Sequence, residues 1–455
     1  MPSRLLRRLP LACALAAVLA SAAQAAVTAL VGGTLIDGTG AAPINNSVVL
    51  IEGDRIVAAG RRSEVSVPTG AAVVSTVGLT VLPGLIDLAV HVDRLGHTNL
   101  ARWREAYAPL TEKVVLPVAA RALLAAGVTT VRDIGAPLES TKRLRRRIED
   151  GKIPGPTLLL TGPIIGRGAT GRASEWLAHS ATELRQAVER LATLGSDAIV
   201  LEDVSDYSAG ELSTLHYAAE DAGLRWYAWI RTDADIAPAV RAGAYGLISL
   251  GSDFHDTLPA EALAALSARA AAGRPVYWEL GASVLTNYEW LRSNAAPIFE
   301  PRWQTALPPI IAEELQHALS HLDTQPIDLE TPTLRLSVLG SRIRSARTAG
   351  ARFLVGSLAG EPGQVPSRAT WQEAEVLVTH AGYTPTEALR AATLDGAFAL
   401  GRDSDIGSIA PGKYADIIAV QGDVLRSIEH LADVRMVYRR GVRYAPAVTA
   451  DSEEL

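Results

Sequence analysis

The segment Leu85-Ile86-Asp87-Leu88-Ala89-Val90-His91-Val92 is short and almost entirely apolar, which is typical of a β-strand buried on both faces. Seven similar segments follow it, and helical segments such as 112–127 (EKVVLPVAARALLAAG) and 183–195 (ELRQAVERLATLG) lie between them. Eight strands that alternate with helices predict an α/β fold, a (β/α)₈ TIM barrel. The predicted strands are 85–92, 128–134, 157–161, 198–202, 225–230, 246–250, 276–280 and 352–355.

The two ends of the chain have a different pattern, in which short alternating runs are separated by turn residues. Segment 47–60 (SVVLIEGDRIVAAG) contains a predicted hairpin turn at Gly53-Asp54, and 434–444 (VRMVYRRGVRY) contains another at Arg440-Gly441. A doubly wound open sheet would need a glycine-rich phosphate loop after its first strand, and the sequence has none after any predicted strand. We therefore expect one small discontinuous β-sandwich domain from residues 26–80 and 404–448, with the barrel at 81–403.

The amino-acid composition is compatible with a folded globular protein and excludes several other classes of protein. The 455 residues include 43 Lys and Arg against 49 Asp and Glu, a formal charge of −6, and 48% of the residues are apolar. This composition is that of a folded globular protein and excludes a disordered or disulfide-stapled chain. The negative charge argues against a nucleic-acid partner.

Residues 1–25 (MPSRLLRRLPLACALAAVLASAAQA) begin with basic residues, continue with an apolar stretch and end in Ala23-Gln24-Ala25. This order is typical of a secretory signal peptide, with cleavage expected after Ala25. The apolar stretch is too short to span a bilayer, and no second candidate follows it. The sequence therefore predicts an exported protein, periplasmic or extracellular, with no stable membrane span.

Four stretches resemble the metal-dependent amidohydrolase superfamily, in the branch that contains imidazolonepropionase and secreted prolidase-like enzymes. They are 81–87 (VLPGLID), 124–133 (LAAGVTTVRD), 384–393 (TPTEALRAAT) and 407–416 (GSIAPGKYAD). They occur in the family's order, from the entry to the first barrel strand to the return into the β domain. The resemblance implies the same barrel with a split β domain, and hydrolysis of carbon–nitrogen bonds with one or two divalent metals.

The resemblance also implies six metal ligands at the carboxyl ends of the barrel strands. These are a His-x-His on strand 1, a carboxylated Lys or a Glu on strand 4, one His each on strands 5 and 6, and an Asp on strand 8. Only His91 matches this set. The other matching positions carry Ala89, Val200, Trp229, Ser249 and Leu358, with Leu250 in place of Ser249 if the register shifts by one.

The absence of five of the six expected metal ligands favours a protein without the family's hydrolytic activity. A catalytic zinc site needs three protein ligands, and the missing aspartate also removes a proton shuttle worth roughly 10²- to 10⁴-fold in rate. We therefore predict a degenerate protein, a pseudoenzyme that needs no cofactor and acts as a binding or accessory protein. Its partner would be a small molecule or a protein, including a second copy of this chain or an active paralogue.

The alternative is an active hydrolase of carbon–nitrogen bonds that binds zinc or another divalent metal at a relocated site. Its ligands would come from two loops after barrel strands, which carry Asp93 and His97 in one and Asp253 and His255 in the other. Loops collect such polar residues in any case, so the interpretation as solvent-edge side chains is preferred. The same holds for His317 and His321, which are spaced i, i+4 without a third ligand. Two further sites of possible acid–base chemistry without a metal are Glu202-Asp203 and Glu279.

Overall fold

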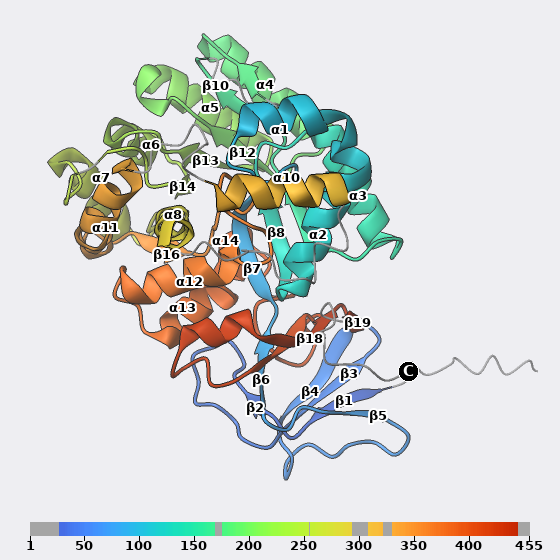
Figure 1. The fold of residues 1–455 in the computed structure, drawn as a ribbon. Coiled ribbons are helices and arrows are strands. Elements are labelled where there is room, and N and C mark those ends of the chain that lie inside the picture. Colours follow the sequence, from blue (N-terminus) through green and yellow to red (C-terminus); the bar gives the residue numbers. More distant parts are fainter. Residues whose placement is uncertain (1–26, 169–174, 254, 294–307, 322–329, 445–455) are drawn as a thin grey trace, which may run out of the picture.

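The computed structural model describes residues 27–168, 175–253, 255–293, 308–321 and 330–444. The predicted signal peptide lies outside these residues. Figure 1 shows a barrel of strands surrounded by helices, and below it a smaller domain of strands from both ends of the chain. The predicted fold class is thereby confirmed.

All eight predicted barrel strands are present, and each lies within its predicted segment and is one or two residues shorter. They are β7 (Leu85–Val90), β8 (Val128–Asp133), β9 (Thr157–Leu160), β12 (Ala198–Leu201), β13 (Arg225–Trp229), β14 (Gly246–Ile248), β15 (Tyr277–Glu279) and β16 (Arg352–Leu354). Two short strands that were not predicted, β10 (Ile164–Gly166) and β11 (Glu175–Leu177), follow β9.

The barrel strands form two parallel sheets, in the orders β7-β8-β9 and β11-β10-β12-β13-β14-β15-β16. Backbone hydrogen bonds join the sheets at both margins. The Leu88 N–H donates to the Val355 carbonyl at 2.9 Å, and the Asp197 N–H donates to the Leu160 carbonyl at 2.7 Å. The first and last strands are therefore neighbours, and their carboxyl ends open on one side, the barrel mouth.

Helices follow the strands on the outside of the barrel. They are α2 (Leu116–Ala125), α3 (Leu138–Glu149), α4 (Ala181–Leu194), α5 (Ala209–Asp221), α6 (Ile236–Arg241), α7 (Ala260–Ala271), α11 (Glu330–Thr348), α12 (Ala369–Thr379), α13 (Pro385–Ala391) and α14 (Leu394–Leu400). Three more follow strand ends or longer loops: α1 (Leu100–Tyr107), α8 (Ser283–Ser293) and α10 (Pro309–Ser320).

Local sequence explains why several of these elements begin where they do. Thr384 caps α13 and forms a capping box with Glu387, so the family-like stretch TPTEAL is a helix start with Pro385 in the first turn. Gly84 lies where the chain enters β7, and a Cβ there would lie 2.2 Å from Thr129 Oγ1. The glycine of the VLPGLID stretch is therefore required by close contact with β8.

The smaller domain contains two sheets. The first has the order β4 (Arg55–Arg61), β3 (Ser47–Glu52), β1 (Thr28–Val31) and β5 (Ala72–Ser75). The second has the order β19 (Val442–Tyr444), β18 (Val434–Arg439), β17 (Ile417–Gln421), β6 (Leu79–Pro83) and β2 (Thr34–Leu35). Both hairpin turns expected from the sequence are present, between β3 and β4 and between β18 and β19.

Strand β6 pairs antiparallel with β17, so residues from opposite ends of the chain share one sheet. A buried cluster with side chains of both sheets, including Leu30, Ile51, Val81 and Ile417, holds the domain together. In the described part of the chain, we find no helix with the length and apolar character to cross a bilayer.

Candidate functional site at the barrel mouth

The barrel interior near the mouth is filled by apolar side chains. Ala89 and Val200 are fully buried, and Trp229 and Leu358 are 8% and 5% exposed. These four residues pack into one cluster, called here the interior apolar cluster, which is completed by Ile134, Ile164, Ala198, Tyr227 and Ile248. The positions to which the resemblance assigns metal ligands therefore converge in space, although their side chains are apolar.

Two residues at the mouth have a strained backbone. Ser249 and Leu358 have φ angles of +72° and +55°, a left-handed conformation that is uncommon outside glycine. Hydrogen bonds hold both: the Ser249 N–H donates to the Glu279 carbonyl at 2.8 Å, and the Leu358 N–H donates to the Ala89 carbonyl at 2.7 Å. Because such strain collects at functional sites, it marks the mouth as the candidate site.

His91, the matching histidine, is buried just after β7 and faces a carboxylate that sequence analysis did not single out. Its Nε2 lies 3.2 Å from Glu361 Oε1, and its ring centroid lies 5.9 Å from that of Trp229. The same Glu361 oxygen accepts a hydrogen bond from Arg94 Nη1 at 2.5 Å. Glu361 therefore holds both His91 and a buried arginine, in a contact between residues 267 positions apart.

These residues do not fit the metal that the resemblance implies. Zinc and similar ions are held by three or four donors from His, Cys, Asp or Glu. Among the residues that the structure describes, no group of three or more such side chains is arranged to hold a metal. The alkyl and indole groups of the interior apolar cluster cannot replace the missing donors.

Asp93 and His97 are only 8% and 1% exposed, so their interpretation as solvent-edge side chains is wrong. The residues of the relocated-site hypothesis nevertheless have separate partners. His97 Nδ1 accepts from the Asn99 N–H at 3.0 Å, and its Nε2 lies 3.7 Å from Glu314 Oε1 on α10. Asp253 accepts a hydrogen bond from the Asp233 N–H, and His255 is exposed. The structure thus gives no support to a single metal site that joins the two loops.

The paired histidines of α10 are also on the surface. His317 and His321 are both exposed, and their rings stack with centroids 4.4 Å apart. His317 lies on α10 and His321 directly follows it, and among the described residues the two are not part of a group of three that could hold a metal.

Two buried carboxyl groups lie close to the mouth. Burial, and then the charge of Asp93, raise the pKa of Asp133 to about 8 against hydrogen bonds from the Val92 and Ala136 amides. Burial also raises the pKa of Asp93, although Arg94 opposes the shift. Asp93 pairs with Arg94, whose Nε lies 3.6 Å from Asp93 Oδ1. Asp93, Arg94 and Glu361 thus form a chain of ion pairs, and Asp133 lies beside it and accepts a hydrogen bond from the Val92 amide at 3.0 Å.

The carboxylates that sequence analysis proposed as acids or bases form ion pairs with arginines. Glu279 forms a fully buried ion pair with Arg132, whose Cζ lies 3.7 Å from the centroid of the Tyr227 ring. Burial raises the pKa of Glu279 to about 7 even though Arg132 opposes the shift. Asp203 pairs with Arg231 and accepts from the Gly168 amide at 2.9 Å. Sequence analysis did not identify these arginine partners.

Two cavities open at the mouth. The first, called here the mouth cavity, has a volume of about 270 Å³. Its apolar lining comes from Trp229, Leu250, Leu280, Val284, Leu285 and Leu358, and its polar lining from Ser249, Tyr288, Arg335 and Glu361.

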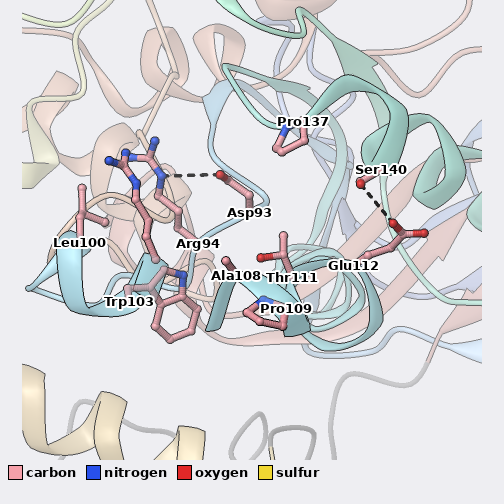
Figure 2. Close-up of a pocket in the computed structure, with 11 residues that line it drawn as sticks. Asp93, Arg94, Leu100, Trp103, Ala108, Pro109, Thr111, Glu112, Pro137 and Ser140 are labelled. Atoms are coloured by element: carbon pink, nitrogen blue, oxygen red, sulfur yellow. Dashed lines mark hydrogen bonds and ion pairs between the residues drawn. The ribbon is translucent and has the colours of Figure 1, made fainter. Parts of the chain in front are cut away.

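The second cavity, called here the side cavity, has a volume of about 300 Å³ and lies between the loop after β7, α1 and the start of α3. Figure 2 shows Asp93 and Arg94 joined on one wall, Trp103 beside them, and Pro137 and Ser140 across the opening. Arg94 lines the side cavity and Glu361 lines the mouth cavity, so their ion pair stands between the two.

The fold and this mouth define a class, the barrel hydrolases that carry a split β domain. An amidohydrolase family model matches residues 80–225 and 328–443, more than half of the chain. The chain belongs to the amidohydrolase family, and the resemblance noted from the sequence is confirmed.

Curated relatives match over shorter regions. The chain is 34% identical over 129 residues to an imidazolonepropionase of Deinococcus deserti, a match that covers 28% of this chain and 32% of the relative. An imidazolonepropionase of Solibacter usitatus is 32% identical over 115 residues, which are 25% of this chain and 27% of that protein. The matched region spans at most about a third of the length of these relatives.

Solved structures match over nearly the whole chain. A putative prolidase from Bifidobacterium longum has a TM-score of 0.70 at 25% identity, covering 94% of this chain and 97% of that one. A Xaa-Pro dipeptidase with bound methionine has a TM-score of 0.71 at 21% identity, covering 92% and 100%. At this level of identity the dipeptidase supports the fold alone.

Proposed function

We propose that this chain is an exported, non-hydrolytic member of the amidohydrolase family that binds a small molecule at the barrel mouth. One observation carries the proposal: four positions that correspond to metal ligands hold Ala89, Val200, Trp229 and Leu358, packed against one another. The signal-peptide-like residues 1–25 support export.

The chemistry of the family explains why this substitution matters. A bound metal lowers the pKa of water and polarises a carbonyl, and a carboxylate moves the protons. Here the one matching imidazole, His91, faces Glu361 and lies beside Trp229. The described side chains at the mouth can exclude water and contact a ligand, and their carboxylate Glu361 is already in contact with His91 and Arg94.

Metal analysis of the purified, processed protein after dialysis tests this proposal. It is combined with assays on acyl-amino-acid and dipeptide amides, with and without added Zn²⁺ or Mn²⁺. We expect far less than one metal per chain and no hydrolysis above the buffer rate. One or more tightly held metals per chain, or metal-dependent turnover, would overturn the proposal.

A further inference from the structure

The mouth cavity is large enough for a small organic molecule. An apolar cavity of about 150 Å³ can hold benzene, and this one has about 270 Å³. It therefore has room for a ring or a branched alkyl chain together with one small polar group. Trp229, Leu280 and Leu358 contribute to its apolar wall.

Arg335 of α11 gives the cavity a positive charge, and the opposing charge that acts on it is that of Asp253, which does not line the cavity. Arg335 donates a hydrogen bond to the Gly251 carbonyl, and we find no ion pair between it and a carboxylate of the described residues. Its neighbour Arg342 is instead paired with Asp233, with 3.0 Å between Nη1 and Oδ2. Burial, and then the charge of Arg342, lower the pKa of Arg335 although the charge of Asp253 opposes the shift, so an added anion would stabilise the charged form of Arg335.

The negative charge in the cavity wall is already balanced. Glu361 Oε1 contacts Arg94 at 2.5 Å and His91 at 3.2 Å. The remaining polar groups in the lining, Ser249 and Tyr288, are uncharged hydroxyls. A cationic ligand would therefore meet Arg335 without gaining a new partner, whereas an anionic ligand would complete one.

We infer that the mouth cavity binds a small monocarboxylate with an aromatic or branched apolar group, its carboxylate paired with Arg335 and its apolar group against Trp229, Leu280 and Leu358. This inference rests on the proposed non-hydrolytic function. A guanidinium and a carboxylate form a two-pronged, charge-assisted contact, which is strong when it is shielded from water.

The test is calorimetric titration of the processed protein with three probes of one shape: 3-phenylpropanoate, 3-phenylpropanamide and 3-phenylpropylamine. We expect the carboxylate to bind at least about ten times more tightly than the amide, and the amine to bind more weakly than either. In Arg335→Met the preference for the carboxylate over the amide should disappear. Arg344→Met is the matched control, because Arg344 is an exposed arginine of the same helix.

A second variant keeps the test decisive if Arg335→Met does not fold. Val284→Phe adds bulk to the cavity wall and should abolish binding of both carboxylate and amide. The inference is overturned if the amide equals the carboxylate, if Arg335→Met keeps the preference, or if no probe binds. Metal analysis separates the two proposals: a metal-free protein that binds no probe refutes the inference alone, and a metal-dependent hydrolase refutes the proposed function.

Discussion

The barrel interior contains two adjoining groups of buried side chains with opposite chemistry. The interior apolar cluster has no charged member, whereas Arg132 and Glu279 form an ion pair that is completely buried. The two groups meet at Tyr227, which belongs to the cluster and lies under the Arg132 guanidinium. The buried charges of Arg132 and Glu279 neutralise each other. The positions to which the resemblance assigns metal ligands, where a bound metal would balance the charge of the ligands, carry apolar side chains instead.

The largest expected effect is on metal content, when the five positions that differ from the family's ligands are changed to metal-ligating residues. The variant combines Ala89→His, Val200→Lys, Trp229→His, Ser249→His and Leu358→Asp, and we expect a change from no bound metal to stoichiometric metal, measured by elemental analysis. The wild type, treated in parallel with the same metal, is the control. A folded variant that stays metal-free would show that these five positions are not the ligand positions.

Breaking the buried ion pair between Arg132 and Glu279 should cause the largest loss in the free energy of unfolding. In Glu279→Ala the Arg132 guanidinium is left buried without its partner, so we expect a loss of about 3–5 kcal/mol in the free energy of unfolding, measured by denaturant titration. The double variant Arg132→Met with Glu279→Leu should recover much of this loss. Glu112→Gln, which breaks an exposed pair with Arg143, should leave the transition unchanged. Equal loss in the single and double variants would contradict this account of the pair.

Removing bulk from the apolar group should have a smaller effect. Leu358→Ala deletes a buried side chain that borders the mouth cavity, and we expect a loss of about 2–3 kcal/mol in the free energy of unfolding. The control is Leu334→Ala, since Leu334 is 61% exposed. A loss no larger than that of the control would mean that Leu358 contributes little to the packing of the interior.

The last prediction concerns pH, and its effect is the smallest of the four when it is taken per pH unit. The pKa of Asp133 is raised to about 8 in the folded protein, against about 4 in an unfolded chain. Between these values the folded state holds a proton that the unfolded state releases, so the contribution of Asp133 to stability is full below pH 4 and is lost as the pH rises towards 8.

We expect Asp133→Asn to flatten this decline by roughly 1 kcal/mol per pH unit between pH 5 and 7. The measurement is a series of denaturant titrations across that range, with wild type alongside. Parallel profiles for the two proteins would contradict the assigned role of Asp133.

Much of the fold could be predicted because it follows from local pattern. Buried parallel strands are continuous apolar runs, so all eight barrel strands were visible, and the close contact at Gly84 accounts for one residue of the motif that carried the resemblance. The resemblance to the family's motifs also singled out Val200 and Trp229, and both lie in the interior apolar cluster.

The partners of the charged residues could not be predicted in this way. Glu361 meets Arg94 across 267 positions, and no spacing in the sequence connects the two. His97 was grouped with Asp93 because the two are near in sequence, but α10 brings Glu314 to His97 from more than two hundred residues away. The left-handed turn at Ser249 has no glycine to announce it, and it depends on Glu279 and Trp278 of the next strand.

The pairing of β6 with β17 sets an order of events for folding. Residues 79–83 are synthesised long before residues 417–421, and their sheet cannot be completed until almost the whole chain has emerged. Strand β6 therefore has one unpaired edge until β17 has been synthesised. Contacts between segments so distant in the sequence form slowly. A sheet that closes only after residues 417–421 have been made is consistent with the export that we propose from residues 1–25, because export through a membrane channel needs a chain that has not yet finished folding.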